Sequence, residues 1–126
     1  MMAADHTLAE QLGLKPGIRC WFHNLPEALR ARIDPDALGI EEQPTATDGL
    51  QCAMLCDHEG DPETLRRELS ALAPLMATHG MLWVLHAGDA AAEKQRIGDL
   101  ADPMNLVIAD TCRFDDNWSG HKLIAK

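Results

Sequence analysis

The chain has 126 residues, of which 46% are hydrophobic and 25% charged, and it carries a formal net charge of −9 with a pI of about 4.9. This length predicts one domain, residues 1–126, large enough to form a core without disulfides or metals. Nucleic-acid binders neutralise phosphates with Lys and Arg, so 11 basic residues against 20 acidic ones argue against nucleic acid and an anionic membrane surface as partners.

The N-terminal segment has neither the basic region nor the apolar stretch of a secretory signal peptide. The apolar run 81–85 is much too short to cross a membrane. We therefore expect a cytoplasmic protein without membrane contact, in which the four cysteines are reduced thiols.

The first sixty residues predict two helices and three strands. A hydroxyl at Thr7 followed three residues later by Glu10 has capping-box spacing and opens a short helix. Residues 24–27 open a second helix, whose buried positions are Leu29 and Ile33. Strands are expected at residues 18–22, at 38–42 as a short edge strand, and at 50–56, an apolar run typical of a strand covered on both faces.

The second half continues this alternation. Asp61 is the predicted N-cap of a helix with Pro62 at its first position, and Gly80 is its predicted end. The apolar stripe of this helix is Leu65, Leu69, Leu72 and Met76, with Pro74 breaking its last turn. A buried strand at 81–86, a helix at 90–101 and two strands at 105–114 and 120–125, joined by a turn at 115–117, complete the chain.

Strands that alternate with helices predict an α/β fold, a three-layer Rossmann-like open sheet that is mostly parallel. The last two strands are closely joined and would form an antiparallel hairpin. If residues 38–42 form a strand outside the first one, the strand order reverses between 18–22 and 50–56. Open α/β sheets bind ligands in the crevice at such a point.

Several polar residues fall at the predicted carboxyl ends of the central strands. They are the candidate ligand-binding residues His23, Asn24, Asp57, His58, Glu59 and His86. Imidazole and carboxylate groups together would hold a divalent ion or carry out acid–base chemistry. The alternative is that these are ordinary polar residues emerging from a buried sheet, and the sequence identifies no catalytic residue.

The loop after the first strand, residues 23–27, lacks the glycines that allow a backbone to approach a nucleotide or S-adenosylmethionine. Asn24 and Glu27 have capping-box spacing and would occupy the free amides of the helix. The neighbouring loop, 57–61, is acidic. We therefore predict no cofactor. S-adenosylmethionine, cationic at sulfur, is the alternative, with Asp57 or Glu59 holding its ribose or amine.

The four cysteines do not predict a metal site. Cys52 and Cys56 are four residues apart on one strand, roughly 13 Å, too far to share one ion. We interpret both as buried thiols that behave as small apolar side chains. Cys20, on the adjacent predicted strand, would approach Cys52, and Cys112 is expected in the core of the hairpin.

Two segments near the ends of the chain carry a family resemblance. Residues 12–17, Leu-Gly-Leu-Lys-Pro-Gly, and the closing pattern Asp-x-x-Trp-Ser-Gly-x-Lys resemble the DUF3052 family of small bacterial proteins, which has no assigned reaction. The closing pattern comprises Asp115, Trp118, Ser119, Gly120 and Lys122. The element order is also similar to class I methyltransferases, so the resemblance implies a reduced methyltransferase-like fold. This sequence departs from the family pattern after Trp83, where the family has a Pro-Lys turn and this chain has residues 86–89, His-Ala-Gly-Asp.

Two functions agree with these features. The first is a non-enzymatic, methyltransferase-like module that has lost its cofactor loop and binds a protein partner or a small ligand at the crevice. The second is an enzyme with a modified S-adenosylmethionine site, or with a metal held by the histidines and carboxylates. The missing glycines favour the first. Trp118 would fold back over the sheet edge, and Ser119 lacks the Gly-x-Ser-x-Gly pattern of a nucleophile.

Overall fold

A computed structural model describes residues 12–57, 61–87, 90–114 and 118–125. These residues form one six-stranded sheet with the order β2-β1-β3-β4-β6-β5. The strands are β1 (Arg19–His23), β2 (Glu41–Glu42), β3 (Leu50–Asp57), β4 (Met76–Ala87), β5 (Leu106–Arg113) and β6 (Trp118–Ala125). The helices are α2 (Glu27–Ile33), α3 (Pro35–Leu38), α4 (Pro62–Leu72) and α5 (Ala90–Ala101), with 3₁₀ turns η1 (Ala73–Leu75) and η2 (Asp102–Met104).

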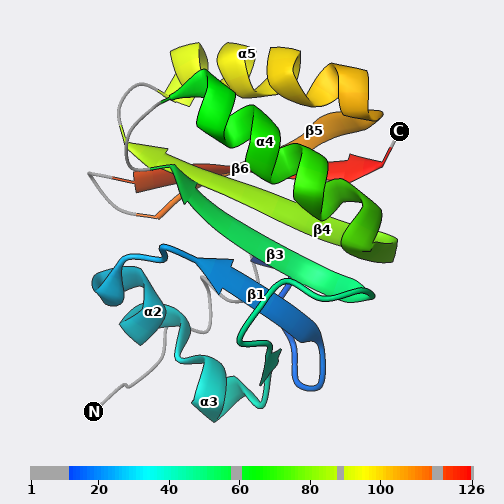
Figure 1. Ribbon diagram of the computed structural model, residues 1–126. Coiled ribbons are helices and arrows are strands. Elements are labelled where there is room, and N and C mark those ends of the chain that lie inside the picture. Colours follow the sequence, from blue (N-terminus) through cyan, green and yellow to red (C-terminus); the bar gives the residue numbers. More distant parts are fainter. Residues whose placement is uncertain (1–11, 58–60, 88–89, 115–117, 126) are drawn as a thin grey trace.

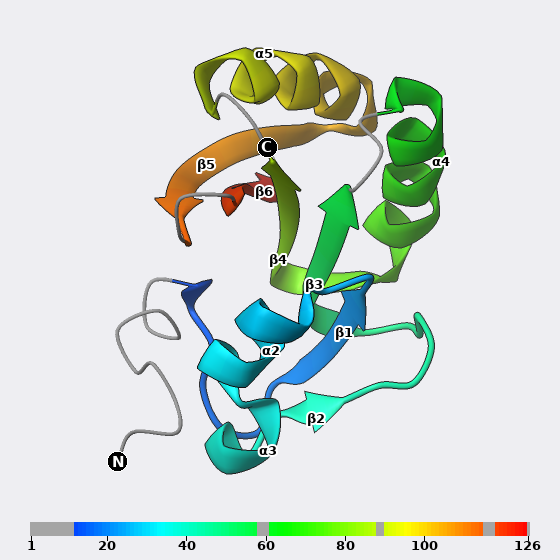
Figure 2. The same cartoon turned by 90° about the vertical axis from the view of Figure 1, so that its left-hand side faces the viewer.

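The sheet is mostly parallel. β2, β1, β3 and β4 pair in parallel, while β6 is antiparallel to both β4 and β5. The helices α2 and α3 lie on one face and α4 and α5 on the other (Figures 1 and 2). The predicted three-layer open sheet with a C-terminal antiparallel hairpin is therefore confirmed. The hairpin places its second strand, β6, inside the sheet, and β5 forms the edge.

Each face of the sheet has its own apolar core. On the α2 side, the fully buried Trp83 of β4 packs with Leu29 and Ile33 of α2. Its indole Nε1 donates a hydrogen bond to the carbonyl of Leu12 at 3.1 Å, which ties the start of the described chain to the sheet. On the other side, the α4 and α5 face, the core contains Leu50, Ala53, Leu55, Leu65, Leu69, Leu72, Leu82, Val84 and Ile97.

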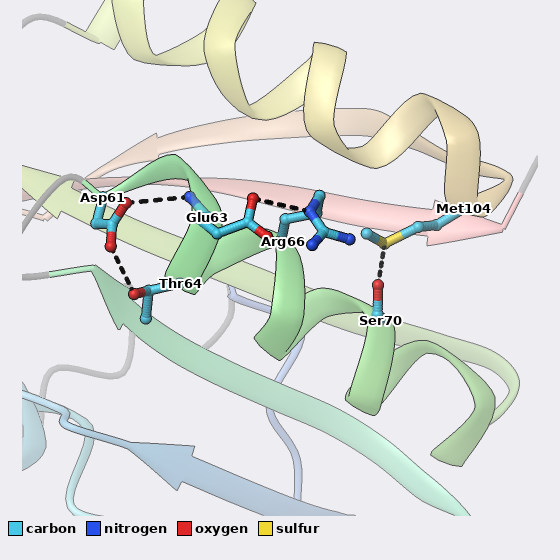
Figure 3. Close-up of polar contacts among 6 residues, drawn as sticks. All are labelled: Asp61, Glu63, Thr64, Arg66, Ser70 and Met104. Atoms are coloured by element: carbon cyan, nitrogen blue, oxygen red, sulfur yellow. Dashed lines mark hydrogen bonds and ion pairs between the residues drawn. The ribbon is translucent and has the colours of Figure 1, made fainter.

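The start of α4 agrees with its predicted N-cap. The carboxylate of Asp61 accepts hydrogen bonds from the Glu63 amide at 3.1 Å and from the Thr64 hydroxyl at 2.8 Å, and Pro62 occupies the first turn (Figure 3). These contacts satisfy helix donors that would otherwise lack a partner. Farther along α4, the Ser70 hydroxyl lies 3.9 Å from the Met104 sulfur of η2, which joins this helix to the end of the α5 segment.

The end of α4 differs from the prediction. The helix ends at Leu72, and β4 begins at Met76, five residues before the expected strand start. The register between β3 and β4 shifts at this point, with Leu50 opposite Met76 and Cys52 opposite Met81. Gly80 therefore lies within β4 and does not stop the helix. A Cβ atom there would lie 2.9 Å from the Ala77 carbonyl oxygen, so glycine is required by the close approach of backbones.

The edge next to β1 also differs in detail. Part of the segment predicted as a strand at 38–42 belongs to α3, and only Glu41–Glu42 pair with β1. β2 and β3 nevertheless flank β1 on opposite sides, so the predicted reversal of strand order is confirmed. The predicted first helix lies outside the described residues, apart from the buried Leu12. Across the described chain, no helix has the length and apolar character needed to span a membrane.

Candidate functional site

The candidate site lies at the carboxyl ends of β1, β3 and β4, where the strand order reverses. Asp57 of β3 is directly opposite His86 of β4, and His23 of β1 is opposite Leu55, two residues earlier on β3. The backbone therefore places these three predicted positions at the same end of the sheet, where the parallel strands have their carboxyl ends. His58 and Glu59 fall outside the described residues.

The connection from β1 to α2 is built differently from the prediction. Asn24 has a φ of 57°, in the left-handed region that Asn tolerates better than most residues. The N-cap of α2 is Pro26, and no side chain caps the helix, so the predicted Asn24–Glu27 capping box is wrong. Asn24 precedes the N-cap residue of α2, Pro26, and does not occupy the cap position itself. The carbonyl of Pro26 accepts from the amides of Leu29 and Arg30, each at 3.0 Å.

His23 is held against the α4 side of the sheet. Its Nε2 lies 2.8 Å from Oε2 of Glu68 on α4. The ring stacks on Trp21, with centroids 5.1 Å apart and an angle of 24° between the planes. The side chains of His23 and Glu68 remain 35% and 29% exposed, so His23 retains contact with solvent. Glu68 is a partner that the sequence did not identify.

His86 is buried and belongs to a hydrogen-bonded chain of side chains that crosses three strands. Its Nδ1 lies 3.1 Å from the Ala87 carbonyl oxygen, and its Nε2 lies 2.9 Å from Nε2 of His121 on β6. Nδ1 of His121 lies 2.9 Å from the hydroxyl of Thr111 on β5. The Ala87 carbonyl can only accept, so His86 donates from Nδ1, His121 donates from Nε2, and Thr111 donates its hydroxyl proton.

Burial is the main influence on the protonation of His121 in this hydrogen-bonded chain. His86 and His121 are 1% and 0% exposed, and their rings stack with centroids 4.9 Å apart. Burial lowers the pKa of His121 to about 4, with further lowering from His86 and from Lys94 on α5. Glu93 of α5 acts in the opposite direction. His121 is therefore neutral at pH 7.

The structure thus separates the predicted histidine and carboxylate cluster into two arrangements. His23 turns to Glu68, while both ring nitrogens of His86 are engaged by Ala87 and His121. Within the part of the chain that the structure describes, no group of three His, Cys, Asp or Glu side chains is placed to hold a metal ion. The hydrogen-bonded role of His86 follows from β6, a strand that the sequence did not place beside β4.

The cysteines lie where the sequence placed them. All four are free and buried, and Cys20 is directly opposite Cys52 on the neighbouring strand. A hydrogen bond to Cys20 and burial together raise the pKa of the Cys52 thiol well above its usual value. Burial also raises the pKa of Cys112. The interpretation of these residues as core thiols is confirmed.

Four residues of the closing motif form the first part of β6, whereas Asp115 lies outside the described residues. Trp118 is partly buried and packs against the α2-side core, and its carbonyl accepts from the Phe114 amide at 2.9 Å. Ser119 is 8% exposed and is opposite His86. Lys122 is half-buried and is opposite Trp83. Trp118 therefore packs on the α2 face of the sheet from an interior strand.

Gly120 has a packing role of its own. A Cβ atom at this position would lie 2.8 Å from Cε2 of Phe114 and 3.4 Å from Cε3 of Trp83. These two rings meet edge to face, with centroids 6.4 Å apart. The absence of a side chain at Gly120 therefore allows Phe114 to close onto the sheet.

Solved structures of methyltransferases share this fold. Mitomycin 7-O-methyltransferase MmcR aligns with 85% of this chain at 15% identity and a TM-score of 0.58. Haemonchus contortus phosphoethanolamine N-methyltransferase 2, in complex with S-adenosyl-L-methionine, aligns with 95% at 13% identity and a TM-score of 0.63. Precorrin-6y C5,15-methyltransferase from Geobacter metallireducens aligns with 97% at 6% identity and a TM-score of 0.59.

The lengths of these proteins differ. The chain spans 41% of the mitomycin enzyme and 36% of the Haemonchus enzyme, but 87% of the precorrin enzyme. No protein-family model matches the chain, and no curated protein matches its sequence. At these identities the likeness concerns the fold: the chain has a methyltransferase-like α/β fold.

Proposed function

We propose that this chain is a non-enzymatic, methyltransferase-like module that has lost the glycine-rich cofactor loop and acts by binding a protein partner or a small ligand. The observation that carries this proposal is the connection between β1 and α2. It contains no glycine, turns at the left-handed Asn24, and enters a seven-residue helix through Pro26, which has no amide hydrogen. The lack of glycine limits how closely this backbone could approach a cofactor, and Pro26 removes one amide donor, which supports the proposal.

The carboxyl ends of the strands around His23 are the binding region in this proposal. His23 is a partly exposed polar group that Glu68 and Trp21 hold in place, so it offers a ligand or partner a fixed imidazole. His23 lies at the point where the strand order reverses, and Asp57 ends the next strand, β3. We further propose that the protein is cytoplasmic, because its sequence has neither a signal-peptide pattern nor a membrane-spanning run. On the strength of the motifs near its two ends, we also propose that it belongs to the bacterial DUF3052 family.

The alternative is an enzyme with a modified S-adenosylmethionine site. The fold favours it, because one of the similar structures is a complex with S-adenosyl-L-methionine. In that case Asp57, at the end of β3, would hold a ribose or an amine of the cofactor. A metal-dependent enzyme has less support, because both ring nitrogens of His86 are already engaged.

Thermal unfolding with S-adenosylmethionine, S-adenosylhomocysteine, ATP, zinc or manganese tests the proposal. A ligand at a hundred times its Kd adds about 2.7 kcal/mol to the free energy of unfolding, which raises the midpoint of a domain of this size by several degrees. We expect no shift with any of the five.

A shift with S-adenosylmethionine or its product that Asp57→Asn removes would overturn the proposal in favour of the enzyme. Asp36→Asn, on α3, is the matched control, since it removes an acidic side chain outside the candidate site. A shift retained in both variants would also count against the proposal and would place the ligand elsewhere.

A further inference from the structure

The buried side chains of His86 and His121 and the exposed Thr111 form a hydrogen-bonded contact, which we call the histidine chain, between β4 and the terminal hairpin. It lies near the end of β4, since Ala87 is the last residue of that strand and its carbonyl closes the chain. β6 is held by β4 on one side and β5 on the other, and the histidine chain has a member on each of the three strands.

We infer that the histidine chain is a proton-sensitive latch that fixes the terminal hairpin to β4 when its imidazoles are neutral and releases it on acidification. The inference rests on hydrogen-bond geometry and burial, and it does not depend on the proposed function. In the neutral chain, every ring nitrogen has a partner of the right kind: Ala87 and His121 for His86, and His86 and Thr111 for His121.

Added protons are incompatible with this arrangement. A first proton on Nδ1 of His121 turns that atom into a donor, so the Thr111 hydroxyl has to rotate and accept. A second proton places an N–H group on each side of the 2.9 Å contact between the two Nε2 atoms, where neither can accept. The pair therefore holds at most one positive charge while the contact remains.

The charged groups of α5 act on such a charge in opposite directions. On α5, Glu93 favours protonation of His121, but Lys94 opposes it, and Glu93 is also paired with Arg96. Asp57 is the register partner of His86 on β3. With burial as the largest effect, the pKa of His121 is about 4 in the closed state. In an opened hairpin His121 returns to an ordinary pKa near 6.5.

The operating range follows from this difference. Between pH 6.5 and pH 4, protonation of His121 in the open state alone increases the open-to-closed ratio by up to tenfold per pH unit. Above pH 7 His121 is neutral in either state, and the latch stays closed.

Amide hydrogen exchange of the wild-type chain between pH 7 and pH 5, divided by the intrinsic chemical rate at each pH, measures this opening. We expect the opening constant of residues 120–123 in β6 to rise at least tenfold from pH 6.5 to pH 5, while the amides paired between β1 and β3 change much less. Imidazole nitrogen NMR at pH 7 should find His86 protonated at Nδ1 and His121 at Nε2. A flat opening constant for β6, or the opposite tautomers, would overturn the inference.

Variants separate the latch from general acid sensitivity. His121→Gln keeps an amide donor but does not titrate, so it should lose at least half of the logarithmic pH dependence. His23→Gln, which removes a histidine on β1, is the matched control and should keep all of it. Equal losses of pH dependence in the two variants, or no loss in His121→Gln, would contradict the latch. If His121→Gln does not fold, the wild-type exchange and tautomers decide the matter.

Discussion

Gly120 shows how one position controls the packing between the hairpin and the sheet. Its missing side chain leaves room for the Phe114 ring, which meets Trp83 edge to face. We expect Gly120→Ala to lower the free energy of unfolding by about 1–3 kcal/mol, because the new methyl group would displace a ring in a well-packed core. Chemical denaturation measures this loss.

Gly98 provides the matched control for this substitution. It lies inside α5, where a Cβ atom would meet only Cδ1 of Ile108 at 3.6 Å, an ordinary contact. Gly98→Ala should therefore stabilise the chain by about 0.5–1 kcal/mol, the usual gain for this change within a helix. Equal effects of the two substitutions would show that Phe114 does not depend on Gly120.

The candidate site could be predicted in position but only partly in composition. His23 and His86 lie at strand ends as expected, because strand boundaries follow from the apolar runs in the sequence. Glu68 and His121 were missed, since they come from a helix face and from a strand whose neighbour was not assigned. The Asn24 cap was wrong because spacing alone does not reveal a left-handed backbone at that residue.

Among the elements, β4 depends on a single glycine near its start. A Cβ atom at Gly80 would lie 2.9 Å and 3.0 Å from the carbonyl oxygens of Ala77 and Leu50, which are backbone atoms in the irregular pairing of β3 with β4. Gly80→Ala should cost about 1–3 kcal/mol in unfolding free energy and should disturb this pairing. Amide exchange of β3 near Cys52 would report the local change, and unchanged protection there would contradict the account.

The N-terminus of α4 offers a prediction at the same scale. Asp61 caps the helix through Glu63 and Thr64 (Figure 3), and these hydrogen bonds hold the pKa of its carboxyl below the usual value, the Thr64 hydroxyl contributing most. Asp61→Ala should lower the thermal midpoint, whereas Asp61→Ser, which retains a capping oxygen, should keep most of it. Equal midpoints for the two variants would show that the cap contributes little.

Element types were more predictable than element ends. The helix at 90–101 has the predicted limits, because it consists of helix-forming residues between loop signals. The prediction made β4 too short because a glycine such as Gly80 often ends a helix. The close approach of the Leu50 and Ala77 carbonyl oxygens to Gly80 is visible only in the structure. The short α3 was missed because residues 35–38 form a single turn without an apolar stripe of their own.

For the whole molecule, the order of elements was enough to predict the architecture. Parallel strands joined by helices, followed by two strands joined by a short turn, leave few ways to cover both faces of a sheet. The position of β6 between β4 and β5 was not predictable from this pattern, because a hairpin can join a sheet through either strand. That placement brings His121 to His86.

Two opposing effects determine stability as the pH falls from 7 to 5. The net charge of −9 is gradually neutralised toward the pI of about 4.9, which reduces repulsion within the folded chain. The pKa of His121 is about 4 in the folded protein and near 6.5 when unfolded, so the unfolded chain binds more protons below pH 6.5. This difference lowers the free energy of unfolding by about 2 kcal/mol at pH 5 and by about 3 kcal/mol at pH 4.

We expect the histidine effect to dominate, because the surface charges are screened by salt while His121 is fully buried. Denaturation at 0.15 M salt should therefore give a lower free energy of unfolding at pH 5 than at pH 7, and His121→Gln should reduce the difference. If stability rose steadily toward pH 5 in the wild-type chain, the relief of charge repulsion would be the stronger effect, and His121 would have to be accessible to protons in the folded state.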